Sequence, residues 1–242
     1  MKIDVLGVKF DDISSKDAAS AVMGLINDGK KGYVVTPNPE IVMECRKDEK
    51  LKDVVNEASF VLPDGIGVLY GAKILGRPMK NRAPGIDFAQ HMFSLLAKEG
   101  KSVFLLGAKQ GVAEKAAENI EKDNPGIVIA GTNDGYFKDA EPVIEKINEA
   151  KPDFLVVCLG FPKQEFFMAE NMDRLDVKYM AGLGGSMDVF AGIVARAPEK
   201  WRKLGLEWLY RLTREPSRIK RMARLPLFIF VVIGRRIKEI FS

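Results

Sequence analysis

An aspartate between a predicted strand and a glycine-rich turn is the first residue of this 242-residue chain that suggests acid–base chemistry. Asp64 stands in Pro63-Asp-Gly-Ile-Gly67, after a short apolar segment and before a segment of helical periodicity. A carboxylate at the end of a strand in an open parallel sheet lies at the edge where such sheets bind ligands, so Asp64 could act as a general base. It could equally do no more than cap the helix that follows, and the residues alone favour neither role.

The glycines beside Asp64 superficially resemble a dinucleotide-binding fingerprint. Gly65, Gly67 and Gly71 give the spacing GxGxxxG, whereas the fingerprint requires GxGxxG. The charge of Asp64 would also oppose a pyrophosphate at the N-terminus of the helix. We therefore expect no nicotinamide site at this turn.

Polar groups also follow other predicted strands, in Thr36-Pro-Asn-Pro-Glu40, Asn133-Asp-Gly-Tyr136 and Gly182-Leu-Gly-Gly-Ser-Met-Asp188. Thr36 and Asn38 offer a hydroxyl and an amide, and Tyr136 could stack on a base. The glycines of the third turn would let the backbone approach a ligand, and Asp188 could accept hydrogen bonds from a ribose or a base. Turn formation and packing are the more frequent roles of such residues, so these motifs stay ambiguous on their own.

The elements that must position these residues follow from the periodicity of the chain. Short β-branched or aromatic segments alternate with longer helical ones between residues 33 and 180, which predicts a Rossmann-like α/β fold with a mainly parallel sheet. The predicted strands are residues 33–36, 59–62, 102–106, 127–130, 154–158 and 177–180, and the predicted helices are residues 15–27, 39–48, 65–75, 85–98, 111–122, 141–150 and 162–171. The ends of these strands should form one ligand crevice.

The last fifth of the chain differs in charge from the rest. Residues 196–242 hold 13 Lys or Arg and four Glu, a balance of +9, whereas the preceding residues hold 24 basic and 29 acidic side chains. A segment of this kind binds anionic partners, such as nucleic acid or the inner face of a membrane. We therefore divide the chain into a catalytic α/β core, residues 1–195, and a basic appendage, residues 196–242.

Two segments of the appendage suggest contact with a membrane. Residues 199–212 suit an amphipathic helix, and residues 225–234 form an apolar stretch that is too short to span a bilayer, which takes roughly 20 residues. We expect this stretch to lie in a core or at a membrane surface, where the apolar side chains of Leu225, Leu227, Phe228, Ile229 and Phe230 would be buried. An apolar face shared between subunits of a homo-oligomer is the alternative.

Four arginines of the appendage have the spacing of one helix face: Arg214, Arg218, Arg221 and Arg224. Their guanidinium groups suit phosphate oxygens. A solvated basic face is the more common explanation of such a series. The adjoining apolar stretch favours a membrane surface over that explanation.

Composition excludes several classes of protein. The chain is 47% hydrophobic and 29% charged, as in globular proteins, and its two cysteines and single histidine provide neither a disulfide framework nor a Cys/His metal site. It contains no DxD, GxxxxGK[ST] or GxSxG motif, which disfavours the commonest metal-dependent phosphate chemistry. The N-terminus lacks the pattern of a secretion signal, so we expect a cytoplasmic protein.

An ordered series of motifs covers nearly the whole chain and resembles the WecG/TagA/CpsF glycosyltransferase family. The motifs are Thr36-Pro-Asn-Pro-Glu40, Pro63-Asp-Gly-Ile-Gly67, Arg82-Ala-Pro-Gly85, Leu106-Gly-Ala-Lys, Asn133-Asp-Gly-Tyr136, Gly160-Phe-Pro-Lys-Gln-Glu165, Gly184-Gly-Ser-Met-Asp188 and Arg196-Ala-Pro. The resemblance implies inverting transfer of N-acetylmannosamine (ManNAc) from UDP-ManNAc to the C4 hydroxyl of GlcNAc in undecaprenyl-diphosphate-GlcNAc, for the linkage unit of wall teichoic acid. Other members of the family use other donor sugars.

The same resemblance implies roles for individual residues. It places the catalytic aspartate at Asp64 and implies that neither a metal nor another cofactor takes part. Thr36, Asn38, Arg82 and Gln164 match the sugar pocket, and Arg214, Arg221 and Arg224 match arginines of an appendage that contacts the lipid-linked substrate and the membrane. We add Tyr136, Gly184, Gly185 and Asp188 as expected substrate contacts.

Two other classes of protein would explain part of the sequence. A nucleotide-dependent oxidoreductase fits the α/β pattern but not the basic and apolar appendage, and a nucleic-acid-binding module fits the appendage but leaves the polar strand ends without a use. We therefore expect a UDP-sugar donor, a polyprenyl-linked acceptor and an anionic membrane surface as partners, and no nucleic acid. The protein should sit peripherally at the inner face of the cell membrane.

Overall fold

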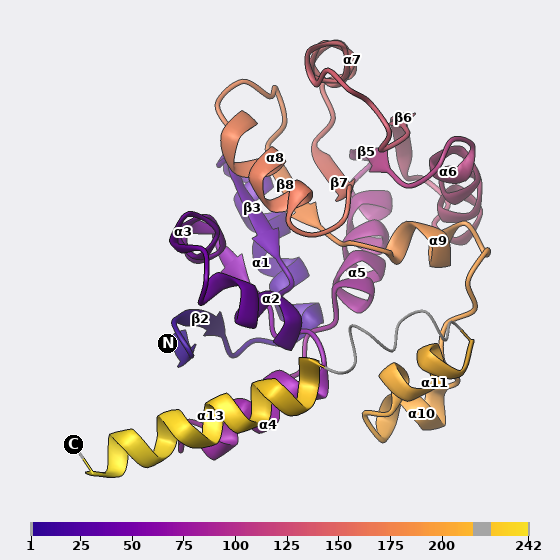
Figure 1. Cartoon of the computed structure of the whole chain (residues 1–242). Coiled ribbons are helices and arrows are strands. Elements are labelled where there is room, and N and C mark those ends of the chain that lie inside the picture. The colour runs from indigo at the N-terminus through magenta and orange to yellow at the C-terminus, as the bar shows by residue number, and fades with distance from the viewer. Residues whose placement is uncertain (1, 215–223, 242) are drawn as a thin grey trace.

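A six-stranded parallel sheet forms the centre of the protein, seen here in a computed structural model that describes residues 2–214 and 224–241. Its strands run in the order β4-β3-β8-β7-β5-β6, and β1 and β2 form a separate antiparallel hairpin (Figure 1). The strands are β1 (Lys2–Val5), β2 (Val8–Asp11), β3 (Gly32–Val35), β4 (Phe60–Val61), β5 (Ser102–Gly107), β6 (Val128–Asn133), β7 (Phe154–Cys158) and β8 (Tyr179–Gly182).

Helices cover both faces of this sheet. They are α1 (Ser15–Asn27), α2 (Pro39–Cys45), α3 (Glu49–Glu57), α4 (Ile66–Ile74), α5 (Gly85–Lys98), α6 (Val112–Asp123), α7 (Glu141–Ala150), α8 (Lys163–Asn171), α9 (Ser186–Phe190), α10 (Glu199–Lys203), α11 (Glu207–Arg214) and α13 (Arg224–Phe241). Along β7, Leu155 and Val157 join one core with α2, α4, α8 and α13, while Phe154 and Val156 join a second core with α1, α5 and α6. Burial on both faces explains why β7 is apolar throughout.

The predicted Rossmann-like α/β class is confirmed. The bounds of α1, α5, α7 and β7 coincide with the predicted ones, and the other predicted strands and helices of the core are present with small shifts. The prediction of one helix over residues 199–212 is wrong. The helix is interrupted between α10 and α11, where Gly205 adopts a positive φ of 71°. The hairpin of β1 and β2, together with α3 and α9, was not predicted.

Helix α13 packs along α4, as Figure 1 shows for the yellow helix. Two glycines of α4 permit this approach: a Cβ on Gly67 would lie 2.7 Å from Leu225 Cδ1, and one on Gly71 would lie 2.7 Å from Phe228 Cζ. The second and third glycines of the GxGxxxG spacing near Asp64 therefore serve helix packing, whereas the first, Gly65, is the N-cap of α4. Phe228, which belongs to the stretch expected in a core or at a membrane surface, is 0% exposed, because it fills the core between α13 and α4.

The appendage thus contributes side chains to the main core, and a boundary at residue 195 stays a prediction. Phe228 and Val232 of α13 are both fully buried beside Val68 and Ala72 of α4. Over residues 2–214 and 224–241, no helix combines the length and the apolar character that a membrane span requires.

Both cysteines are buried and unpaired, as expected from their spacing. Cys45 ends α2 and Cys158 ends β7. Burial raises the pKa of each thiol to about 12, so both remain protonated at neutral pH.

Candidate active site

A pocket of about 380 Å³ opens at the carboxyl ends of β4, β3, β8 and β7. Asp64 follows β4, Thr36 follows β3, Gly184 follows β8 and Gly160 follows β7, and all four residues line the pocket. Parallel pairing brings these strand ends to one edge, although the residues are far apart in the sequence. The pocket therefore lies where the sheet predicts a ligand crevice.

Most of the predicted site residues meet in this pocket. Its lining includes Thr36, Asn38, Asp64, Arg82, Gln164, Gly184, Gly185 and Arg224. Tyr136, Asp188 and Arg214 are not among the lining residues, and Arg221, like Arg218, falls outside the described residues.

Tyr136 and Asp188 lie toward the other end of the same sheet edge. Tyr136 is 73% exposed in a turn after β6, and a Cβ on the neighbouring Gly135 would lie 3.2 Å from Gly107 Cα at the end of β5. Asp188 is half-buried in α9, the helix whose first residue, Ser186, lines the pocket. Arg214 ends α11, with its guanidinium carbon 5.6 Å from the centre of the Tyr210 ring.

The turn around Asp64 shows that this residue does not cap helix α4. The N-cap position is Gly65, which has a positive φ of 84°, and no side chain in the described part of the chain caps the helix. The Asp64 N–H donates to the carbonyl of Pro37 over 3.2 Å, which ties the turn after β4 to the turn after β3. The Asp64 carboxylate therefore lines the pocket without serving as the N-cap of α4.

Thr36 and Asn38 hold the neighbouring turn. The Thr36 hydroxyl donates to the carbonyl of Gly182 over 3.1 Å, which joins the ends of β3 and β8. Asn38 is the N-cap of α2, and its Oδ1 accepts from the Ile41 N–H at 3.1 Å. Asn38 thus has a structural role in the turn as well as a place in the pocket wall.

Gln164 is fixed at both ends of its side-chain amide. Its Oε1 accepts from the Gly184 N–H at 3.0 Å, and its Nε2 donates to Oε1 of Glu165 at 2.9 Å. Glu165 is 1% exposed, and burial raises the pKa of its carboxyl to about 7, although the hydrogen bond from Gln164 lowers it. No local sequence pattern reveals Glu165 as a site residue, because its burial depends on tertiary packing.

The two arginines of the pocket are each held by carboxylates. Arg82 Nη2 lies 3.8 Å from Glu207 Oε2, and Arg224 Nη1 lies 3.2 Å from Glu40 Oε1 and 2.9 Å from Glu44 Oε1. These contacts connect the core to α11 and to the start of α13. A bound diphosphate would compete with the same carboxylates for the guanidinium groups.

Asp12 holds the loop that precedes Arg82. Its carboxylate accepts from the N–H of Lys80 at 3.1 Å and from the N–H of Asn81 at 2.9 Å. Burial alone would raise the pKa of Asp12, but these hydrogen bonds lower it below its usual value. An ionised Asp12 therefore fixes the backbone just before Arg82.

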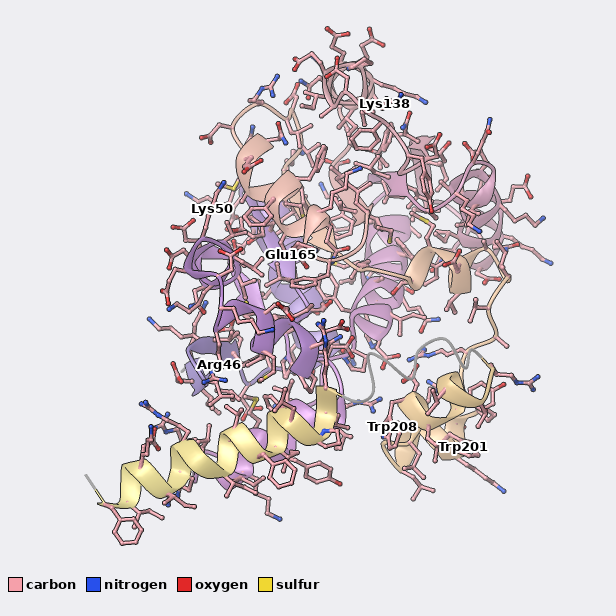
Figure 2. The ribbon with its side chains drawn as sticks, in the orientation of Figure 1. Arg46, Lys50, Lys138, Glu165, Trp201 and Trp208 are labelled. Atoms are coloured by element: carbon pink, nitrogen blue, oxygen red, sulfur yellow. The ribbon has the colours of Figure 1, made fainter. Side chains whose placement is uncertain are left out.

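Helix α11 brings into the pocket wall an aromatic side chain that no motif of the sequence marks as part of a site. Trp208 lines the pocket and also a smaller groove of about 200 Å³. Figure 2 shows Trp208 and Trp201 on the small helical unit formed by α10 and α11. The groove is mostly apolar and is lined by Ile66, Gly67, Tyr70, Leu204, Gly205, Leu206, Trp208, Leu225 and Ile229. The apolar groove therefore adjoins the pocket, with which it shares lining residues such as Trp208 and Leu225.

One face of α13 leaves its apolar side chains exposed. These are Leu227, Phe230, Ile233, Ile237, Ile240 and Phe241, of which Phe230 is 72% exposed. Their spacing, mostly three or four residues, places these side chains on one side of α13.

Among the described residues, no group of three or more His, Cys, Asp or Glu side chains could hold a metal ion.

Comparisons with known proteins agree with this arrangement. The model of the "Glycosyl transferase WecG/TagA/CpsF family" matches residues 3–241. A Bacillus spizizenii protein is 39% identical over 208 residues, covering 86% of this chain and 81% of the relative. A Staphylococcus aureus protein is 33% identical over 242 residues, covering 98% of this chain and 95% of the relative.

Both relatives carry the same name, N-acetylglucosaminyldiphosphoundecaprenol N-acetyl-beta-D-mannosaminyltransferase, as does a Bacillus subtilis protein that is 39% identical over 207 residues, 85% of this chain and 81% of the relative. The family match spans the core and the appendage alike. With its pocket at the carboxyl edge of a parallel sheet, this chain belongs to the WecG/TagA/CpsF family and is a glycosyltransferase.

Proposed function

We propose that this protein transfers ManNAc from UDP-ManNAc to the C4 hydroxyl of GlcNAc in undecaprenyl-diphosphate-GlcNAc, with inversion at the anomeric carbon. The names of the relatives support the acceptor and the transferred sugar. The observation that carries the proposal is the pocket in which Asp64 lies with Arg82 and Gln164 and which adjoins an apolar groove. A polar sugar site beside an apolar groove suits a substrate that is half sugar and half lipid.

In the proposed reaction, Asp64 acts as the general base. The C4 oxygen of the acceptor attacks the anomeric carbon of ManNAc while the bond from that carbon to UDP breaks, and the electron pair of the broken bond leaves with the diphosphate. The Asp64 carboxylate takes the proton of the attacking hydroxyl. Thr36, Asn38 and Gln164 contact the sugars, and Arg82 stabilises the charge that develops on the diphosphate. The proposal needs no metal ion.

The nucleotide would extend along the sheet edge beyond the pocket. Gly184 and Gly185 form the backbone wall of the pocket, and α9, which carries Asp188, starts directly after them. Tyr136 is exposed farther along that edge. We assign the uridine contacts to Tyr136 and Asp188 and the diphosphate contacts to the turn at Gly184.

The acceptor lipid would enter from the side of the appendage. Arg224 lines the pocket and Leu225 lines both the pocket and the groove. In our proposal Arg224, with Arg214 and Arg221, holds the acceptor diphosphate, and the first isoprene units lie in the groove against Trp208.

The appendage, residues 196–242, would also hold the protein at the inner face of the membrane. The exposed apolar face of α13 would enter the interface, and each basic residue near an anionic surface adds about 1 kcal/mol. The same face could instead bind a second copy of the chain. Co-sedimentation with anionic vesicles, alongside measurement of the oligomeric state, shows whether this face binds lipid or a second copy of the chain.

A donor comparison tests the proposal directly. The full-length protein is incubated with UDP-ManNAc, UDP-GlcNAc or UDP-glucose and a short-chain lipid-diphosphate-GlcNAc, and the disaccharide is identified by mass spectrometry. We expect a product with UDP-ManNAc only, a β-linkage to C4, and no loss of rate in excess EDTA. A product from another donor would reassign the sugar, and loss of activity in EDTA that magnesium restores would contradict the metal-free mechanism.

A further inference from the structure

Glu165 is a buried carboxyl group without a cation beside it. It is 1% exposed, and among the described residues it forms no ion pair. One carboxyl oxygen accepts from Gln164 Nε2 at 2.9 Å, and the other, Oε2, has no hydrogen-bond partner within residues 2–214 and 224–241. Glu165 belongs to α8, where Figure 2 labels it. Burying such a group is unfavourable, so its presence requires a reason other than packing.

The carboxyl group fixes which way the Gln164 amide points. Above its pKa of about 7 the Glu165 carboxyl group is ionised and only accepts hydrogen bonds, so it selects the NH₂ end of the amide. The opposite end then faces the Gly184 N–H, from which Oε1 accepts at 3.0 Å. A reversed amide would place its oxygen against the carboxylate and its NH₂ against the Gly184 N–H. Both contacts would be repulsive, so the amide has one orientation.

This orientation leaves one group of Gln164 for a ligand. Nε2 carries two N–H groups, and in the described part of the chain only the one directed at Glu165 is used. Gln164 is 3% exposed and lines the pocket beside Gly184. Space for the amide is provided by Gly182, where a Cβ would lie 3.0 Å from Nε2.

We propose that Glu165 is a positioning residue for sugar transfer: acting through Gln164, it holds an amide N–H in the pocket for a hydroxyl or acetamido oxygen of the bound sugar. This inference rests on the proposed function, because it requires Gln164 to touch the substrate. Glu165 itself does not contact the substrate in this arrangement. Its effect on the reaction must therefore pass through Gln164.

A double-mutant cycle tests that dependence in the full-length protein. Glu165→Leu removes the acceptor and should lower kcat about 10- to 100-fold, because the amide is no longer held in place. In a Gln164→Ala background the same change should alter kcat less than twofold. Glu165→Gln can still accept through its amide oxygen and should restore most of the rate. The melting temperature of Glu165→Leu should not fall, since an unpaired buried charge has been removed.

The remaining outcomes of the cycle distinguish failure of this inference from failure of the proposed function. If Glu165→Leu reduces kcat equally in both backgrounds, Glu165 does not act through Gln164 and the inference is wrong. If Gln164→Ala alone leaves kcat unchanged, the sugar site of the proposed function fails instead.

Asn171→Ala is the matched control, since Asn171 is buried on the same helix and donates to the Phe167 carbonyl at 2.9 Å. It should lower the melting temperature and leave kcat unchanged. If Glu165→Leu does not fold, the cycle is run with Glu165→Met.

Discussion

Arg82 and Glu207 join two walls of the pocket, with 3.8 Å between Nη2 of the arginine and Oε2 of the glutamate. Arg82 belongs to the loop between α4 and α5, whereas Glu207 is the first residue of α11 in the basic appendage. Both side chains are less than one-fifth exposed. The appendage is therefore part of the pocket wall, and changes in it should affect catalysis as well as attachment to a membrane.

Removal of the Asp64 carboxylate should abolish most of the transfer. Asp64→Asn keeps the shape of the side chain but not its basicity, and general-base catalysis contributes about 10² to 10⁴ in rate. We expect kcat to fall by that factor in the disaccharide assay, with UDP binding retained in calorimetry. Asp28→Asn, at an exposed carboxylate that ends α1, serves as the control. A near-normal rate for Asp64→Asn would show that Asp64 is not the general base.

Arg224 should matter for the acceptor more than for the donor. A hydrogen bond to a charged group is worth about 1.5 to 3 kcal/mol, so Arg224→Ala should raise KM for the lipid acceptor at least tenfold and leave the affinity for UDP unchanged. Arg235→Ala is the matched control, because Arg235 lies on the same helix and pairs with Glu239 at 2.9 Å. If the two variants have the same KM, Arg224 does not hold the acceptor.

The exposed face of α13 should control attachment to vesicles. Phe230→Ser alters a side chain that is 72% exposed, so we expect weaker sedimentation with anionic vesicles and an unchanged melting temperature. Phe228→Ala, two residues away, should instead cost about 3 to 5 kcal/mol of folding free energy, because Phe228 is fully buried. Equal vesicle binding by wild type and Phe230→Ser would argue that this face does not contact lipid.

Helix α4 should not tolerate a side chain at Gly71. A Cβ there would lie 2.7 Å from Phe228 Cζ, so Gly71→Ala should displace α13 and lower the melting temperature. Gly24→Ala in α1 is the control, because nothing lies within 4 Å of its added Cβ. There the better helix propensity of alanine should add about 1 kcal/mol of stability. Denaturant unfolding of the two variants measures the difference.

Stability should fall as pH rises through the range in which Glu165 ionises. Burial raises the pKa of Glu165 to about 7, so between about pH 4.5 and 7 the folded protein holds a proton that the unfolded chain has lost. Folding is therefore favoured at the acidic end of this range. Glu165→Gln removes this dependence and should gain up to about 3 kcal/mol over wild type by pH 8. Urea unfolding at several pH values measures the slope, with Glu170→Gln, on the same helix, as the control.

The parallel sheet was predictable because its central strands, such as β7, are buried on both faces. Residues 154–158 read Phe-Leu-Val-Val-Cys, and each is buried in the structure. The hairpin of β1 and β2 carried a signal that was overlooked: Ile3, Val5, Val8 and Phe10 alternate with polar or exposed residues around a Leu6-Gly7 turn. Helix α3 likewise has a readable N-cap, since Asp48 accepts from the Leu51 N–H at 3.1 Å.

The site was predictable only as far as single turns and the family resemblance extend. Asp64 and Thr36 each follow the end of a strand, and Gln164 lies in the first turn of α8, the helix after β7; strand ends converge in a parallel sheet. Glu165 and Trp208 could not be assigned from the sequence, because their roles depend on what packs against them. The packing role of Gly67 and Gly71 could not be predicted for the same reason, since their partners Leu225 and Phe228 lie more than 150 residues later.

The burial of both cysteines makes the protein convenient for site-specific spectroscopy. Cys45 and Cys158 are the only cysteines of the chain, and their thiols, with pKa values of about 12, are shielded from maleimide reagents at neutral pH. A cysteine introduced on the exposed face of α13 would then be the single reactive position, without prior replacement of the native thiols. A fluorophore or spin label placed there would report immersion depth in a bilayer directly.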